Sequence, residues 1–388
     1  MQALLLCLLI INARSNKSAR FIIQFYAIVV AVMFLLSLQA ISHRGLTNVL
    51  MQIFVHTKYI LFVSMFFVFL GVERVRALVS VFVAISIFFL FFDLLFPGIL
   101  HGIFDIKQQI RGNSIRPIGI QAHTAPLGFL FSMFSIYILF FTKRRDAFWY
   151  ALFAVCIVLV FLTSVRTALM AFPVILMWLF KDSLKHASFA LFFIIPALIF
   201  FSKTKYAEEL VYITQENILV SIENPQENAY IRGMMLYFSF ELANENFPTG
   251  TGAATFGTVR SDDSDVYAYL GVQNSRFFIE KDGIYDSNFA SVLGEFGYLG
   301  MALYYISFVM FITSKKILPG GYRFGVGSVP LLLVFLFYSF TNPVFMNTSQ
   351  VIIFLMFYFA SLEKIPIAVS KAATVIAHKE EILYNADK

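Results

Sequence analysis

Long apolar runs recur along almost the whole chain. Several hold 15–25 residues, enough to cross a hydrocarbon core about 30 Å thick. The chain is 59% hydrophobic and only 13% charged, against roughly 25% charged for a soluble domain. The runs are continuous rather than alternating, which favours helices over a β-barrel. The sequence therefore predicts an all-α fold, a polytopic bundle of transmembrane helices.

About eleven spans are expected. The first, at 1–13, is too short for an ordinary span. Either this helix is shallow and begins on the outer side, or one further helix precedes it in the chain. The second case would make twelve spans. A cleaved signal peptide would carry its basic residues before the apolar run rather than after it. The other spans are placed at 21–41, 58–72, 77–97, 126–142, 147–165, 167–180, 187–201, 289–313, 324–341 and 349–362.

Basic residues are unevenly shared between the two sets of connectors. One set holds 17 Lys and Arg residues and is predicted to be cytoplasmic by the positive-inside rule. The opposite set of short connectors holds six cations. The pI near 9.1 thus reflects cytoplasmic loops, and no nucleic-acid partner is expected. The first set is 14–20, 73–76, 143–146, 181–186, 314–323 and 363–388; the six cations are Arg44, Lys58, Lys107, Arg111, Arg116 and Arg166.

Residues 202–288 form the one long polar stretch, with 13 acidic and 6 basic residues. Alternation of the connectors places this stretch outside, as one large periplasmic loop domain. The expected division is N-terminal transmembrane helices at 1–201, the loop at 202–288, C-terminal helices at 289–362 and a cytoplasmic tail at 363–388. The localisation expected is a bacterial inner membrane, crossed many times.

Four arginines are candidates for holding an anionic substrate. Arg166 sits in a tight connector, where a guanidinium is costly without an anionic partner; the alternative is an arginine that reaches up to lipid phosphate. Arg232 lies beside the apolar face of a helix predicted over 228–245. Arg260 and Arg276 share the same loop. Arginines on one outer face suit bidentate contacts with phosphate.

Glycine turns and polar residues at the mouth of a span complete the predicted site. Gly250 and Gly252 lie in a segment whose backbone N–H groups are able to face a phosphate or sugar. Asn288 stands where the polar loop enters the span at 289–313.

Three residues are candidates for a general base, in the order Asp286, Glu295 and His123. Burial at the mouth of a span would raise a carboxyl pKa towards neutrality. A helix cap is the alternative for Asp286 but does not explain Glu295 among apolar residues. His123 precedes Pro126 closely and is equally consistent with a cap.

No metal or other cofactor is expected. The Asp-x-Asp pattern at 263–265 lies in a polar stretch without further ligands, so a solvated loop is favoured over a cation site. His101 and His123 are too few for a metal centre. Cys7 and Cys156 lie in apolar spans and are expected to serve packing.

In this order, the segments 164–168, 230–235, 247–252, 286–288 and 295–300 resemble the superfamily of O-antigen polymerases and O-antigen ligases. The resemblance covers mainly residues 126–313. It implies metal-independent glycosyl transfer from undecaprenyl-diphosphate-linked glycans at the periplasmic face. Arg166 and Arg232 would hold the diphosphate. Family ligases typically carry His-Asn where this chain has Ser287 and Asn288, so a polymerase is favoured.

Other functions stay open at this stage. A ligase that moves glycan onto lipid A core is the nearest alternative. A transporter of lipid-linked sugars is disfavoured because the span interiors are expected to be nearly uncharged. An acyltransferase would usually require a histidine deep in the membrane, and the sequence predicts none there. Besides the bilayer and the lipid-linked glycan, a chain-length regulator and a flippase are the partners that a polymerase implies.

Overall fold

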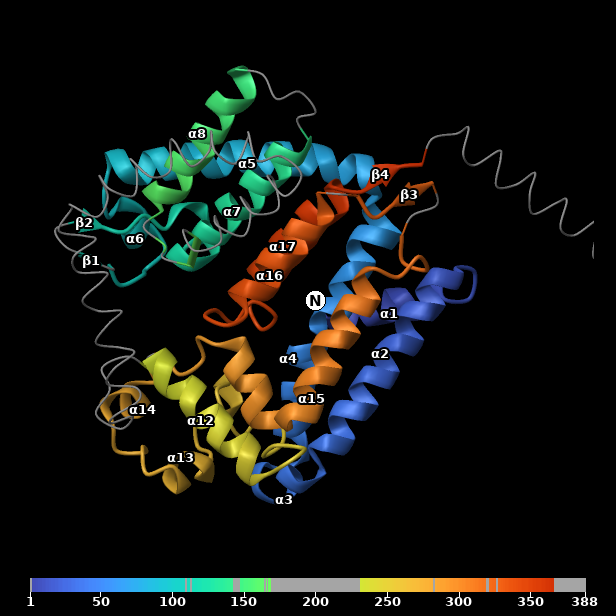
Figure 1. Cartoon of the computed structure of the whole chain (residues 1–388), viewed down its shortest axis with the longest axis vertical. Coiled ribbons are helices and arrows are strands. Elements are labelled where there is room, and N and C mark those ends of the chain that lie inside the picture. Colours follow the sequence, from blue (N-terminus) through green and yellow to red (C-terminus); the bar gives the residue numbers. More distant parts are fainter. Residues whose placement is uncertain are drawn as a thin grey trace, which may run out of the picture.

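The computed structural model describes residues 2–108, 110–111, 114–141, 147–163, 165, 167–168, 231–281, 283–318, 321–325 and 327–365. Within these residues the chain is mostly helical, with two short antiparallel strand pairs (Figure 1). The predicted all-α polytopic fold is confirmed. The predicted spans at 167–180 and 187–201 and most of the tail lie outside the described residues, so the count of eleven stays a prediction.

The first half of the chain forms helices from α1 to α8. Asn16 caps the long helix α2 through its side chain, which accepts from Ser18 N and Ala19 N. Two short strands pair in the connector between α5 and α7. The elements are α1 (Gln2–Asn12), α2 (Lys17–Leu36), η1 (Leu38–Ala40), α3 (Ile41–Arg44), α4 (Leu46–Ser64), the π-helical η2 (Met65–Leu70), α5 (Val72–Leu95), α6 (Ile99–Ile103), β1 (Ile110–Arg111), β2 (Ser114–Ile115), η3 (Gly119–Gln121), α7 (Thr124–Phe141) and α8 (Ala147–Leu162).

The second half resumes at Ile231 with the helices of the polar loop. The predicted apolar face of the 228–245 helix is confirmed in α12, where Ile231, Met234, Met235, Phe238 and Leu242 are all buried. They form a separate small core with residues of α13 and α14. The elements are α12 (Ile231–Glu245), η4 (Val259–Ser261), α13 (Asp265–Tyr269), α14 (Arg276–Glu280), α15 (Asn288–Ile312), β3 (Tyr322–Arg323), α16 (Ser328–Tyr338), α17 (Thr348–Ala360) and β4 (Glu363–Lys364).

Four described helical segments are long and apolar enough to cross a membrane: Lys17–Leu36, Leu46–Phe67, Val72–Leu95 and Asn288–Ile312. The second corrects the span predicted at 58–72. A connector was expected before Lys58, but its polar residues are absorbed into the buried side of α4, which begins twelve residues earlier at Leu46. The outer connector predicted to hold Lys58 is therefore shorter, and Lys58 lies inside the helix.

Connectors predicted to share a side of the membrane meet in the structure. At the end that carries α12, Arg44 bonds to Asp263, and Ser287 Oγ donates to Phe340 O at 2.8 Å (Figure 1). At the other end, β3 pairs with β4, and Arg76 Nε donates to Ala360 O at 3.0 Å. This sorting is what the alternation of basic residues predicts.

Helix α15 is kinked at Gly297, whose φ of 63° and ψ of −169° are not helical. The kink leaves backbone groups without helical partners, and the segment 248–252 binds them. Thr251 N donates to Gly294 O at 3.0 Å, and Leu299 N donates to Pro248 O at 3.2 Å. A loop of the polar domain is thus docked into the bundle by backbone hydrogen bonds.

Gly250 permits this close approach. Its φ is +70°, and a Cβ added there would lie 2.7 Å from Gly294 O. Gly45 has a similar φ of +75° with open space around it. We expect Gly45→Ala to cost about 1–3 kcal/mol of unfolding free energy through backbone strain. Gly250→Ala should cost more than that, because it also displaces the loop.

The two variants would be compared by the midpoint of thermal unfolding in detergent. Equal midpoints would show that the close contact between the loop and the kink contributes nothing to stability.

Candidate functional site

Two predicted site residues form an ion pair at the end of the bundle that carries α12. Arg232 of α12 contacts Asp286 Oδ2 with its Nε at 3.0 Å and with one terminal nitrogen at 2.7 Å. The side chains are 31% and 37% exposed, so both remain accessible from solvent. The pair joins α12 to the segment that leads into α15. The arginine predicted to bind phosphate and the carboxylate predicted to act as the base are thus in direct contact.

His123 lies close enough to this pair to feel its charges. Its pKa is lowered chiefly because surrounding atoms displace water, even though the side chain keeps an exposed surface. The charge of Asp286 acts in the opposite direction, and the charges of Arg116 and Arg232 lower the pKa further. The Nδ1 atom of His123 also accepts from Ala125 N at 3.2 Å. The structure therefore gathers two predicted bases and two arginines from three separate segments.

The start of α15 is held by the connector between α16 and α17. Ser287 caps the helix by accepting from Ala290 N at 3.1 Å. Asn288 is fully buried, and its backbone N donates to Asn342 O at 3.3 Å. The hydroxyl groups of Thr167 and Thr341 are 3.2 Å apart. A helix cap was the alternative role expected for Asp286. Ser287 makes this cap, so the Asp286 side chain is not needed to cap α15.

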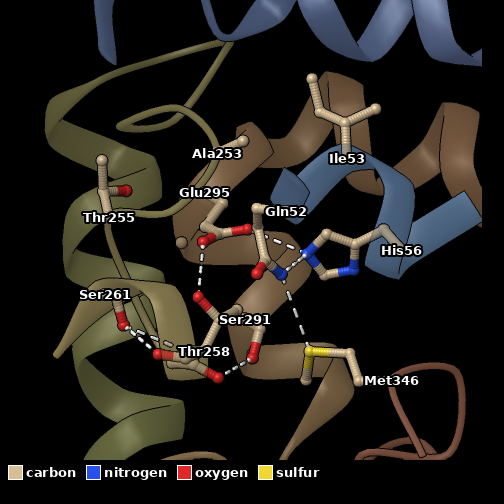
Figure 2. A network of polar contacts seen from close by, with 12 residues as sticks. Gln52, Ile53, His56, Ala253, Thr255, Thr258, Ser261, Ser291, Glu295 and Met346 are labelled. Carbon is tan, nitrogen blue, oxygen red and sulfur yellow. Dashed lines mark hydrogen bonds and ion pairs between the residues drawn. The ribbon is translucent and has the colours of Figure 1, made fainter. Parts of the chain in front are cut away.

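Glu295 lies on α15, two turns inside the helix, in a network of buried polar groups (Figure 2). Its Oε2 is 2.9 Å from His56 Nε2, and its Oε1 accepts from the Thr258 hydroxyl at 3.3 Å. Backbone N–H groups of Ala254 and Phe256 also donate to the carboxylate. His56 Nε2 lies 2.9 Å from the side-chain nitrogen of Gln52 as well. One carboxylate thereby connects α4, α15 and the docked loop.

The buried residues of α4 and α15 change three expectations from the sequence. Glu295 and His56 are both completely buried, so Glu295 does not stand in an open mouth. The span interiors are not nearly uncharged, because His56 and Lys58 lie within the span-length helix Leu46–Phe67. The expectation that no histidine stands deep in the membrane region is wrong for the same reason. Lys58 donates to Met346 O and to the Thr348 hydroxyl, which satisfies its buried charge.

The N–H groups of the two predicted phosphate-binding glycines already have partners. Gly250 N donates to Asn246 O at 2.9 Å, and Gly252 N donates to Glu295 O at 2.6 Å. Gln39 binds Gly250 O from the other side. A phosphate would have to displace these bonds to reach the two N–H groups. Their geometry is accounted for by docking of the loop.

The acidic run that follows the loop is used for cross-links. Arg44 of α3 bonds to Asp263, and this holds the pKa of the Asp263 carboxyl below its usual range. Asp262 accepts from Lys281 at 2.8 Å and from the Tyr285 hydroxyl. Among the residues that the structure describes, no group of three His, Cys, Asp or Glu is placed to hold a metal ion.

The remaining predicted arginines are less constrained. Arg260 has an exposed side chain, and its carbonyl accepts from Arg44 at 2.7 Å. Arg276 begins α14. Arg166 lies outside the described residues. The hydrogen bonds from Arg44 to the loop and the contact between His56 and Glu295 were not predicted from the sequence. The signal that marks both is a cation or histidine beside an apolar run with no local explanation.

We expect Glu295→Ala to destabilise the protein strongly, by about 3–5 kcal/mol of unfolding free energy. It removes one partner of a fully buried pair and leaves His56 and Thr258 unsatisfied. The matched control is Glu363→Ala, which breaks the exposed Arg323–Glu363 pair and should cost under about 1 kcal/mol. Thermal unfolding midpoints in detergent measure both. A Glu295→Ala midpoint as high as that of the control would contradict a structural role for the network.

Comparison with known proteins gives one match. Residues 151–305 match a family model described as O-antigen ligase, about two-fifths of the chain. The matched stretch includes α12, the larger part of α15 and the Arg232–Asp286 pair. No match was found among the curated proteins. The family match confirms the resemblance to O-antigen polymerases and ligases, glycosyltransferase-like membrane enzymes that act on lipid-linked glycans.

Proposed function

We propose that this chain is a polysaccharide polymerase. It joins undecaprenyl-diphosphate-linked repeat units at the periplasmic face by glycosyl transfer without a metal ion. The observation that carries the proposal is the accessible pair of Arg232 and Asp286, with Arg116 and His123 beside it. The pair lies inside the family match and at the end of the bundle where the polar loop gathers.

Arg232 binds the diphosphate in this proposal, together with Arg166. A diphosphate is already a good leaving group, and guanidinium charge stabilises the negative charge that develops as the glycosidic bond to it breaks. Arg116 adds a further cation near the same place. Arg260 and Arg276 belong to the same polar loop and are proposed to attract the anionic substrate. Asn288 is buried and the N–H groups of Gly250 and Gly252 are already bonded, so these three residues would act by supporting the site from beneath.

Asp286 is the proposed base. It accepts the proton of the acceptor hydroxyl as that oxygen attacks the anomeric carbon of the donor glycan. A diphosphate bound to Arg232 competes with Asp286 for the guanidinium, so arrival of the donor releases the carboxylate for its task. Glu295 and His123 are the second and third candidates. Glu295 would first have to leave its partners His56 and Thr258.

The alternative within the family is a ligase, which the description of the matching family favours. A ligase needs a second, different acceptor, whereas a polymerase makes a ladder of products from lipid-linked repeat units alone. A chain-length regulator and a flippase are partners that only the polymerase proposal implies. The bacterial inner membrane, with the polar loop in the periplasm, is the proposed location.

We expect purified protein to build such a ladder from lipid-linked repeat units. Arg232→Ala and Arg166→Ala should each lower the rate by about 10²–10³-fold, because each removes a charge that stabilises the leaving diphosphate. Gel separation of the labelled glycan measures the rate. Lys281→Ala is the control, since it breaks the Lys281–Asp262 pair of the same outer unit at 2.8 Å.

Full activity in both arginine variants would contradict the proposed site. A wild-type protein that makes no ladder until lipid A core is added would be a ligase.

The dependence of the rate on pH separates two of the base candidates. His123 has a pKa below its usual value near 6.5, so it is largely neutral at pH 7 and gains a proton only in more acidic solution. If His123 were the base, activity would fall in acidic solution, at a pH below the ordinary histidine pKa, and His123→Gln would abolish that acidic limb. We expect the limb to persist in His123→Gln, and Asp286→Asn to lower the rate by about 10²–10⁴-fold. Loss of the limb in His123→Gln would transfer the role of base to His123.

A further inference from the structure

A basic pocket lies far from the outer site, between the start of α2 and the segment after α15. It has a volume of about 400 Å³. Four cations line it: Lys17 and Arg20 from α2, and Lys315 and Lys316 from the segment after α15. No acidic residue is among the described residues that line it. Four like charges around one cavity repel one another unless an anion occupies it.

Two of the cations are held in place by the wall of the pocket. The ammonium group of Lys316 lies 4.9 Å from the centre of the Phe21 ring, a cation–π contact. Arg20 donates from Nε and from one terminal nitrogen to Ala13 O, both at 3.4 Å. Lys17, Arg20, Lys315 and Lys316 all remain exposed. Two of the four charges are thus held at the rim of a cavity that a solvated anion can enter, and the other two are exposed beside them.

An apolar groove continues from this pocket along the same two helices. It has a volume of about 200 Å³ and is lined by Phe25, Val29 and Val32 of α2 and by Gly300, Leu303 and Ser307 of α15, among others. Phe21 and Gln24 line the pocket, and Phe25 and Ile28 line the groove, so the two adjoin within one helical turn. The seam between α2 and α15 therefore offers cations at one end and an apolar channel beyond them.

We propose that this seam binds an anionic phospholipid, with its headgroup phosphate in the basic pocket and one acyl chain in the groove. The pocket joins two connectors, 14–20 and 314–323, that are predicted to be cytoplasmic. Basic pockets at that surface of membrane proteins attract anionic headgroups. The Arg232–Asp286 pair lies at the opposite end of α15, so this lipid site is separate from the site of glycosyl transfer and independent of that proposal.

Native mass spectrometry of the protein in detergent measures the lipid retained. We expect wild type to bind phosphatidylglycerol in preference to phosphatidylcholine. Lys315→Gln/Lys316→Gln should lower the affinity for phosphatidylglycerol by about thirtyfold, because each of the two surface cations contributes about fivefold. Lys315→Arg/Lys316→Arg should keep the preference. Arg74→Gln/Arg323→Gln removes two cations from the same end of the bundle, outside the pocket, and should change the affinity little.

Several outcomes would overturn the proposal. Equal retention of the two lipids would do so, as would an equal loss in the Arg74→Gln/Arg323→Gln control. Inorganic phosphate is added as a separate arm. If millimolar phosphate displaced phosphatidylglycerol completely, the pocket would be a site for free phosphate rather than for a lipid.

The groove is tested by filling it. Val32→Trp places an indole in the groove, whereas Leu35→Trp places one on an exposed face of the same helix, outside the groove. We expect Val32→Trp to weaken phosphatidylglycerol binding by at least tenfold and Leu35→Trp to leave it unchanged. Equal binding by both variants would show that no acyl chain lies in the groove. None of these measurements depends on catalytic activity.

Discussion

The docking of residues 248–258 onto α15 around its kink is the constraint on which the end of the bundle that carries α12 depends. A helix interrupted at Gly297 exposes carbonyl and N–H groups that are costly to leave unpaired away from water. The loop pairs them with Thr251 N and Pro248 O, and the Glu295 carboxylate binds the loop again from within the bundle. Kink, loop and carboxylate therefore stabilise one another, and none is explained without the other two.

This arrangement couples the outer unit to the N-terminal helices. Gln39 and Arg44, from the turn between α2 and α4, bind carbonyl groups of the docked loop and of the segment after it. Ser37 accepts from Ala253 N at 3.1 Å. Ser37, Arg44 and Glu295, which hold the loop, are buried, whereas the Arg232–Asp286 pair remains about one-third exposed. A rigid base beneath an accessible charged pair is the arrangement that positions reactive groups without immobilising the substrate.

The sequence predicted elements whose signal is local. Continuous apolar runs gave the helical bundle, and spacing of three and four residues predicted the buried face of α12 correctly. The start of α4 was missed because Gln52, His56 and Lys58 look like a polar connector until their partners are known. Those partners lie far away in the chain: Glu295 is 239 residues from His56, and Met346 is 288 residues from Lys58. A cation or histidine beside an apolar run signals that such a partner exists, but no local pattern identifies which distant residue it is.

The same limit applied to the candidate site. Arg232 was singled out from a helix face and Asp286 from the mouth of a span. Their separation along the sequence did not indicate that they are in contact. The glycines at 250 and 252 were noticed for their backbone freedom, which is real, but the chain uses that freedom to approach α15. Positive φ values show that the backbone comes close to something; only the neighbouring segments show what that is.

Two carboxylates at one end of α15 have environments that suit different tasks. Glu295 is enclosed by His56, Thr258 and two backbone N–H groups, so any proton transfer to substrate would require the loop to leave the kink. Asp286 is partly open to solvent and has Arg232 as its charged partner, a partner that an incoming diphosphate competes for. A base must reach the proton it takes, within hydrogen-bonding distance or through one water. Accessibility therefore supports the proposal that Asp286 is the base, whereas the burial of Glu295 favours a structural role.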